Sequence, residues 1–215
     1  MNAALTRVKV CGITNLHDAE LAVRLGADAI GFIFCESPRR IAPQRAREIV
    51  RMLPPFVTAV GVFVNAPAAE VLKTAEEVGL GAVQLHGLES PESVDEISRS
   101  VKVIKAFRVQ GPKTLAECEA YPSASAFLFD TYAAGRLGGT GLTFDWTILA
   151  GFRGAPVAGR PWILAGGLRP ENVQEAVARC RPYGIDVSSG VEKEPGIKDP
   201  VKLEQFIMKA RQIIP

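Results

Sequence analysis

Two reactive side chains stand directly after runs of apolar residues that are typical of buried strands. Cys11 ends the first run within the motif KVCGIT, and Asp130 follows three apolar residues in FLFD. A carboxyl group adds nothing to the packing of a core, so we favour a catalytic role for Asp130 over a helix cap or a loop turn. Most buried cysteines are simply small apolar residues, but Cys11 precedes a glycine at the end of a strand. A thiol and a carboxyl group at such places can move protons as base and acid.

A buried charge pair is expected beneath the thiol. Strand alternation places Lys9 on the same face as Cys11, and a lysine that points into a protein interior needs a partner. Asp186 is the inward acid of the last predicted strand by the same alternation. If the last strand pairs with the first, these two groups meet. We therefore predict a Lys9–Asp186 pair, whose positive member favours the thiolate over the thiol.

Two consecutive strands near the C-terminus end in small, donor-rich turns. The segment WILAGGLRPEN is interpreted as a strand, the pair Gly166-Gly167, and a helix that begins at Pro170. The next strand ends in a turn that includes Ser189 and Gly190. Either turn alone is most simply a tight turn. Together, their backbone amides and the helix N-terminus favour a phosphate site.

Further polar side chains follow other predicted strands. For the adjacent Arg39 and Arg40, one interpretation is a solvated loop, and the other is a fork that binds a substrate carboxylate. Gln84 and His86 end the strand in VQLHG, and we interpret His86 as a substrate contact or a hydrogen-bonded wall. Together with Asp186, these two residues are expected to contact substrate.

The composition excludes several classes of protein. The chain has 215 residues, of which 47% are hydrophobic and 22% charged, as in soluble globular proteins. A formal charge of +2 without a basic block indicates no nucleic-acid partner. No apolar run approaches the ~18 residues of a membrane span, and no apolar signal segment is evident. We therefore expect a cytoplasmic protein. The four cysteines and two histidines lack metal-site spacing, so no metal is expected.

The chain alternates strand-like and helix-like segments without a linker. Strands are predicted over residues 8–11, 29–34, 57–64, 82–85, 101–107, 126–129, 162–165 and 185–187. Helices are predicted from 15 to 25, 43 to 53, 67 to 78, from 90 onward, and over 114–119, 144–149, 170–179 and 200–213.

Eight apolar strands joined by helices predict a parallel sheet with right-handed crossovers, which closes into a single (β/α)8 TIM barrel over residues 1–215. The alternative is an open doubly wound sheet. The turn after the first strand, CGITN, lacks the dinucleotide fingerprint typical of that fold. In a barrel, the polar residues named above, apart from Lys9 beneath Cys11, fall at the carboxyl ends of strands, where such folds place their chemistry.

The chain also resembles a known family. The motifs KVCGIT, DAIGFIF, SPRRI, VGVFVN, VQLHG, FLFDT, GGTG, TFDW, LAGGLRPENV and DVSSGVE occur in this order through nearly the whole chain. They resemble the phosphoribosylanthranilate isomerase family of tryptophan biosynthesis. The resemblance implies an α/β barrel without a cofactor, which rearranges N-(5-phosphoribosyl)anthranilate, a small phosphosugar, into a 1-deoxyribulose product.

Residue roles follow from the same motifs. Cys11 resembles the general base of the family, Asp130 the general acid, and Arg39 the arginine that meets the anthranilate carboxylate. The resemblance assigns phosphate binding to Gly166, Gly167, Ser189 and Gly190. Gly139 and Gly141 of the GGTG loop are expected either to add amides to this site or to belong to a flexible lid.

Two rival functions remain open at the level of sequence. One is another cofactor-free phosphosugar isomerase or epimerase on a similar barrel. The other is a non-catalytic barrel that binds a phosphosugar, for which the phosphate turns alone would suffice. The acid and the thiol at one rim speak against the second. The sequence is compatible with a monomer or a homodimer.

Overall fold

Eight parallel strands form a closed barrel, each hydrogen-bonded to the next along the chain. The structure is a computed structural model that describes residues 5–109, 113–130, 149 and 156–212. The strands are β1 (Arg7–Cys11), β2 (Ala29–Ile33), β3 (Thr58–Phe63), β4 (Ala82–Leu85), β5 (Lys102–Arg108), β6 (Ala126–Asp130), β7 (Trp162–Ala165) and β8 (Gly184–Val187). Every strand lies within one residue of its predicted bounds, and the predicted barrel is confirmed.

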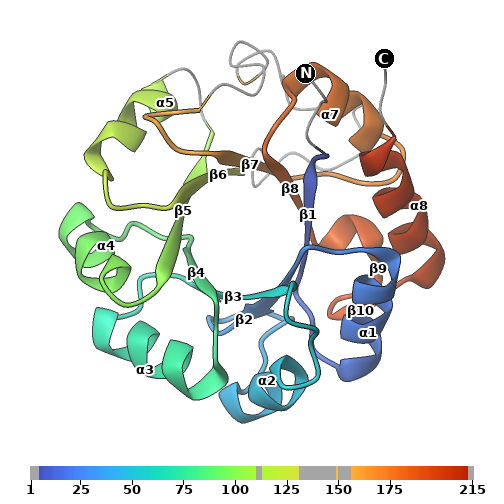
Figure 1. Cartoon of the computed structure of the whole chain (residues 1–215), viewed down its shortest axis with the longest axis horizontal. Helices are drawn as coiled ribbons and strands as arrows, with labels where there is room; N and C mark the ends of the chain where they lie inside the picture. Colours follow the sequence, from blue (N-terminus) through green and yellow to red (C-terminus); the bar gives the residue numbers. More distant parts are fainter. Residues whose placement is uncertain (1–4, 110–112, 131–148, 150–155, 213–215) are drawn as a thin grey trace.

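Helices surround the barrel as an outer ring (Figure 1). They are α1 (Leu16–Leu25), α2 (Pro43–Val50), α3 (Ala68–Val78), α4 (Pro91–Ser98), α5 (Lys113–Glu117), α7 (Val173–Cys180) and α8 (Pro200–Arg211), with the 3-10 turns η1 (Cys118–Ala120) and η2 (Ser189–Val191). No helix in the described ranges is long and apolar enough to cross a membrane.

The helix boundaries follow from local capping chemistry. The Asn15 side chain accepts a hydrogen bond from the Asp18 amide and begins α1, and Gly26 ends it with φ 101°. Ser90 caps α4 in the same way, with Pro91 in the first turn. These signals are local, which is why the sequence predicts them.

Two predictions about the last third of the chain need correction. Helix α7 begins at Val173 rather than Pro170, because Asn172 first closes a turn by bonding to the Arg169 amide and the Gly167 carbonyl. A small antiparallel hairpin, β9 (Glu192–Glu194) and β10 (Ile197–Lys198), was not predicted. Its strands are short and charged, so they lack the apolar pattern of a buried strand. The helix predicted over 144–149 lies outside the described residues except for its last position.

Strand alternation divides the core into two layers. One face of each strand packs against the helices, as Val8 and Val10 do in β1. The other face fills the barrel with a cluster of mostly small side chains: Val60, Ala82, Ile104, Ala106, Ala126, Leu128, Ile163 and Ala165. By the same alternation Lys9, Gln84, Asp130 and Asp186 belong to the inward face.

A buried ion pair connects β5 to the loops that follow β3 and β4. Lys105 Nζ lies 2.9 Å from Oε2 of Glu89 and donates to the Gly87 carbonyl at 2.8 Å, and both charged side chains are only 2% exposed. Oε1 of Glu89 accepts from the Asn65 and Gly87 amides. The Lys105 ammonium also lies 5.7 Å from the ring centroid of Tyr121. Every member of this network has a partner, as a buried polar network requires.

The protonation of Glu89 links this network to pH. Burial raises the pKa of the carboxyl group, but Lys105 and the backbone amides outweigh it and hold the pKa below its ordinary value of 4.5. The ionised pair therefore stabilises the fold above pH ~4.5, and this contribution is lost as the pH falls through the lowered pKa of the folded state.

Replacing Lys105 by Met tests this account. The substitution leaves Glu89 buried without its cation, so we expect the free energy of unfolding at pH 7 to fall by about 3–5 kcal/mol in urea titrations. Arg99→Met, which breaks the exposed Arg99–Asp95 pair, serves as the control and should cost less than about 1 kcal/mol. Equal losses in the two variants would refute a stabilising role for the buried pair.

Candidate active site

The closure of the barrel places a charge pair under the thiol, as predicted. In the register between β1 and β8, Lys9 stands opposite Asp186. Lys9 Nζ lies 2.9 Å from Oδ1 of Asp186, and the two side chains are 5% and 10% exposed. The Lys9–Asp186 pair is therefore confirmed, and the ammonium does not reach solvent.

Cys11 lies above this pair in a crowded corner. The neighbouring strand has Gly31 at this level, where an added Cβ would come within 2.8 Å of the Cys11 sulfur and 3.1 Å of Lys9 Nζ. Glycine thus makes room for both groups, since any larger residue would displace them. Cys11 is 6% exposed.

The electrostatics at Cys11 only partly follow the prediction. Burial raises the pKa of the thiol, and Asp186 raises it too, whereas Lys9 and Lys198 lower it. The net pKa lies above the ordinary value. Lys9 thus favours the thiolate as expected, but desolvation outweighs it because a buried thiolate loses its hydration.

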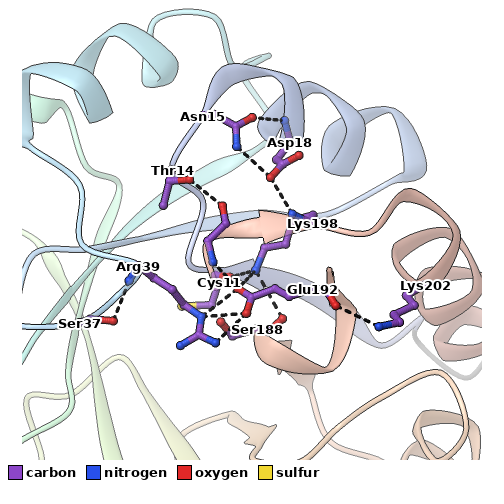
Figure 2. A network of polar contacts seen from close by, with 11 residues as sticks. Cys11, Thr14, Asn15, Asp18, Ser37, Arg39, Ser188, Glu192, Lys198 and Lys202 are labelled. Atoms are coloured by element: carbon purple, nitrogen blue, oxygen red, sulfur yellow. Dashed lines mark hydrogen bonds and ion pairs between the residues drawn. The ribbon is translucent and has the colours of Figure 1, made fainter. Parts of the chain in front are cut away.

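Two functional candidates, Glu192 and Lys198, were missed at the sequence level. Both belong to the unpredicted hairpin, which lies against the end of β1 (Figure 2). Lys198 Nζ donates to the Cys11 carbonyl at 2.6 Å and to Oε1 of Glu192 at 2.9 Å. The lysine side chain is fully buried and that of Glu192 is 4% exposed. The sequence offered one signal for these two residues: Glu192 is the last residue of the motif DVSSGVE, which resembles the family.

The adjacent arginines Arg39 and Arg40 have different surroundings, because only Arg39 bonds to Glu192. Its Nε lies 2.8 Å from Oε1 of Glu192, its Nη2 lies 2.6 Å from Oε2, and its side chain is 21% exposed. The stem of Arg39 lies over Gly12, where an added Cβ would come within 2.8 Å of Cδ. Arg40 is exposed. The structure therefore brings Arg39 to the Cys11 side of the rim and leaves Arg40 in solvent.

His86 lies between Asp130 and the buried Gln84 and contacts both side chains. Its Nε2 lies 3.3 Å from Oδ2 of Asp130, and its Nδ1 lies 3.0 Å from Nε2 of Gln84. Gln84 is 1% exposed, and its Oε1 has no partner within the described part of the chain. The three side chains thus form a row from the core to the rim. The strand order leaves β7 and β8 between Asp130 and the Cys11 strand.

The turns predicted to bind phosphate lie next to each other. A Cβ at Gly190 would collide with the carbonyl oxygen of Leu168, so the loops after β7 and β8 are in contact, and only glycine fits there. Gly166 and Gly167 have φ of 88° and 63°, which glycine adopts without strain. Ser189 is exposed in η2. Gly139 and Gly141 lie outside the described residues.

The described residues contain no group of three or more His, Cys, Asp or Glu side chains that could hold a metal ion.

Comparisons with known proteins agree on one family. A family model described as "N-(5'phosphoribosyl)anthranilate (PRA) isomerase" matches residues 8–209. A relative from Citrifermentans bemidjiense with the name N-(5'-phosphoribosyl)anthranilate isomerase is 51% identical over 97% of this chain and 98% of its own length.

Solved structures give the same result. The phosphoribosyl anthranilate isomerase of Thermotoga maritima superposes with a TM-score of 0.88 at 45% identity, covering 95% of this chain and 98% of the other. A second structure of such an isomerase, at 43% identity and TM-score 0.84 with the same coverage, contains reduced 1-(o-carboxyphenylamino)-1-deoxyribulose 5-phosphate. A third, from T. maritima at 42% identity and TM-score 0.84 with the same coverage, is described as a monomer produced from a dimeric enzyme.

The influence of Lys9 on the thiol can be measured directly. Because Lys9 lowers the pKa of Cys11, Lys9→Met should move the pH midpoint of Cys11 alkylation by iodoacetamide to higher pH and slow alkylation at pH 8. Peptide mass spectrometry separates Cys11 from the other cysteines. Lys102→Met removes an exposed lysine at the start of β5 and should leave the midpoint unchanged.

A double variant keeps this test informative if Lys9→Met alone does not fold. Lys9→Met combined with Asp186→Asn removes both charges and should still raise the midpoint, by less than Lys9→Met alone, since Asp186 acts in the opposite direction. An unchanged midpoint in both variants would show that Lys9 does not control the thiol.

Proposed function

The chain belongs to the N-(5'-phosphoribosyl)anthranilate isomerase family and catalyses that isomerisation in tryptophan biosynthesis, and we propose that Cys11 and Asp130 carry out its proton transfers. The observation that supports these roles is the alternation of β1 and β6, which directs both groups inward at the carboxyl ends of their strands. Family membership over residues 8–209 disfavours the two rival functions, a different phosphosugar isomerase and a non-catalytic barrel.

The proposed reaction has two proton transfers. Protonated Asp130 gives its proton to the ribose ring oxygen while the C1–O bond breaks, and the open chain becomes a Schiff base. Cys11, as thiolate, then removes the proton from C2, and the electron pair moves into the C1–C2 bond to give an enolamine. Tautomerisation yields the ketone of the 1-deoxyribulose product. No oxidant or reductant is consumed.

His86 supports the acid role of Asp130. In the structure the NH2 group of the Gln84 amide faces Nδ1 of His86 and donates to it, so Nε2 of His86 carries the ring proton and can donate to the Asp130 carboxylate that remains after proton transfer. Turning the amide by 180° would place its oxygen at Nδ1 and reverse this polarity, so that Nε2 would accept a hydrogen bond from protonated Asp130. We therefore assign His86 and Gln84 to the acid side of the site.

The two ends of the substrate have different partners in this proposal. The glycines Gly166, Gly167 and Gly190, with Ser189, bind the phosphate through backbone amides, as two packed loops of small residues allow. Arg39 binds the anthranilate carboxylate at the opposite end. Contacts of His86, Gln84 and Asp186 with the sugar, and of Gly139 and Gly141 with the phosphate, stay predictions. So does the cytoplasmic location.

Two substitutions test the proton transfers. Cys11→Ser and Asp130→Asn should each lower turnover by about 10²- to 10⁴-fold while the product is still bound, because each variant keeps its shape and loses only its proton chemistry. The anthranilate group is fluorescent, so its signal reports turnover and binding. Cys35→Ser, a half-buried thiol outside the proposed site, is the control. Weakened binding with unchanged turnover would contradict the catalytic roles.

We also propose that the chain forms a homodimer. One related structure is described as derived from a dimeric enzyme. Between α2 and β3 the side chains of Met52 and Phe56 are 63% and 95% exposed, with two prolines between them. A protruding apolar turn of this kind is typical of a protein interface.

Sedimentation analysis tests this assembly. At micromolar concentration the wild-type chain should sediment as two copies, and Phe56→Ser should shift it toward one copy because the exposed ring no longer contributes apolar contact. Leu88→Ser, which changes an equally exposed side chain after β4, should leave the mass unchanged. A single-copy mass for the wild type would exclude the dimer.

A further inference from the structure

The guanidinium group of Arg39 is held by one edge only. Glu192 accepts from Nε at 2.8 Å and from Nη2 at 2.6 Å, so its carboxylate occupies the edge that these two nitrogens share. The other edge consists of Nη1 and the second hydrogen of Nη2. No residue in the described part of the chain accepts a hydrogen bond from Nη1. A planar guanidinium that is clamped on one edge presents the other edge in a fixed direction.

Glu192 is itself fixed on several sides. Its Oε1 accepts from Lys198 Nζ at 2.9 Å and from the Gly196 amide at 3.3 Å, and its own carbonyl accepts from Lys202 Nζ at 3.0 Å. Its side chain is 4% exposed. Burial raises the pKa of Glu192, but Arg39 and Lys198 outweigh it and hold the pKa below its ordinary value, so the group is a carboxylate at neutral pH.

The hairpin that contains Glu192 is tied to the end of β1. Lys198 donates through Nζ to the carbonyl of Cys11, and its backbone amide donates to Asp18 at 2.8 Å (Figure 2). Thr14 donates to the Gly196 carbonyl at 2.6 Å. The position of Glu192, and through it the direction of Arg39, is therefore set relative to the residue that removes the proton.

The charges of this cluster suit an anion. Arg39 and Lys198 carry two positive charges, and Glu192 carries one negative charge between them. The cluster keeps one net positive charge, and the partly exposed Arg39 is the member that a ligand can reach. A carboxylate that binds the open edge of Arg39 would complete the charge balance by a bidentate contact.

We propose that Glu192 is a positioning residue, which presents the open edge of Arg39 to the substrate's carboxylate and thereby makes the site specific for a carboxylated aryl group. Lys198 holds Glu192 in register with Cys11. This inference rests on the proposed function, which places the substrate carboxylate at Arg39. A purely structural role, in which Glu192 only anchors the hairpin, would affect all ligands alike.

Two ligands that differ by one group separate these roles. The probes are 1-(2-carboxyphenylamino)-1-deoxyribitol 5-phosphate and its counterpart without the carboxyl group, and their dissociation constants are measured by calorimetry. In the wild type the carboxylated ligand should bind about 10- to 100-fold more tightly, as expected for a charge-assisted contact. Glu192→Gln should reduce this ratio by about tenfold and change the affinity for the other ligand by less than about threefold.

Controls and a double variant sharpen the test. Glu194→Gln makes the same change at an exposed acid of the same hairpin and should leave the ratio intact. Arg39→Ala should bring the ratio close to one, and adding Glu192→Gln to it should lower the ratio no further, because Glu192 acts through Arg39. If Glu192→Gln does not fold, Glu192→Asp replaces it in this test. The shorter side chain keeps the negative charge but moves it away from Arg39, so the affinity ratio should fall here too.

The outcomes distinguish this inference from the function on which it rests. Equal losses of affinity for both ligands in Glu192→Gln, or effects that add to those of Arg39→Ala, would overturn the positioning role while wild-type turnover stands. A wild-type protein that converts no phosphoribosylanthranilate would overturn the proposed function and, with it, this inference.

Discussion

The pairing of β1 with β8 is the constraint on which the site depends. Closing the sheet buries Lys9 inside the barrel, and the register of the two strands supplies Asp186 directly opposite. An unpaired ammonium at this depth would be very costly, so closure and charge pairing require each other. The same pairing places β1 beside β8, with β7 next in the barrel (Figure 1).

Burial and charge act against each other at the thiol. The crowded corner beside Gly31 excludes water, which raises the pKa of Cys11, while the cations beneath and beside it lower the pKa. The net effect raises the pKa of Cys11, so the thiol is the favoured form at neutral pH, while Lys9 and Lys198 reduce the cost of forming the thiolate. Oδ2 of Asp130 lies 3.3 Å from Nε2 of His86, so the two side chains proposed to transfer protons have different neighbours at one rim.

Two buried lysines connect loops at this rim by the same kind of contacts. Lys105 and Lys198 each bond to a glutamate and to backbone carbonyls near the ends of neighbouring strands. Lys105 ties together the loops next to His86, and Lys198 ties the β9–β10 hairpin to Cys11. Such ammonium groups supply several donors where strand ends leave carbonyls without partners.

The sequence by itself determined the barrel, its eight strands, most helix boundaries and the Lys9–Asp186 pair. The strands and helices follow from periodicity and capping, which are properties of neighbouring residues, and the pair follows from alternation once the predicted barrel pairs β8 with β1. Only the tertiary structure decided that Glu192 and Lys198 join Arg39 and Cys11, that His86 meets Asp130, and that burial outweighs Lys9 at the thiol. These outcomes depend on distances between residues far apart in the chain and on the exclusion of water, neither of which local patterns contain.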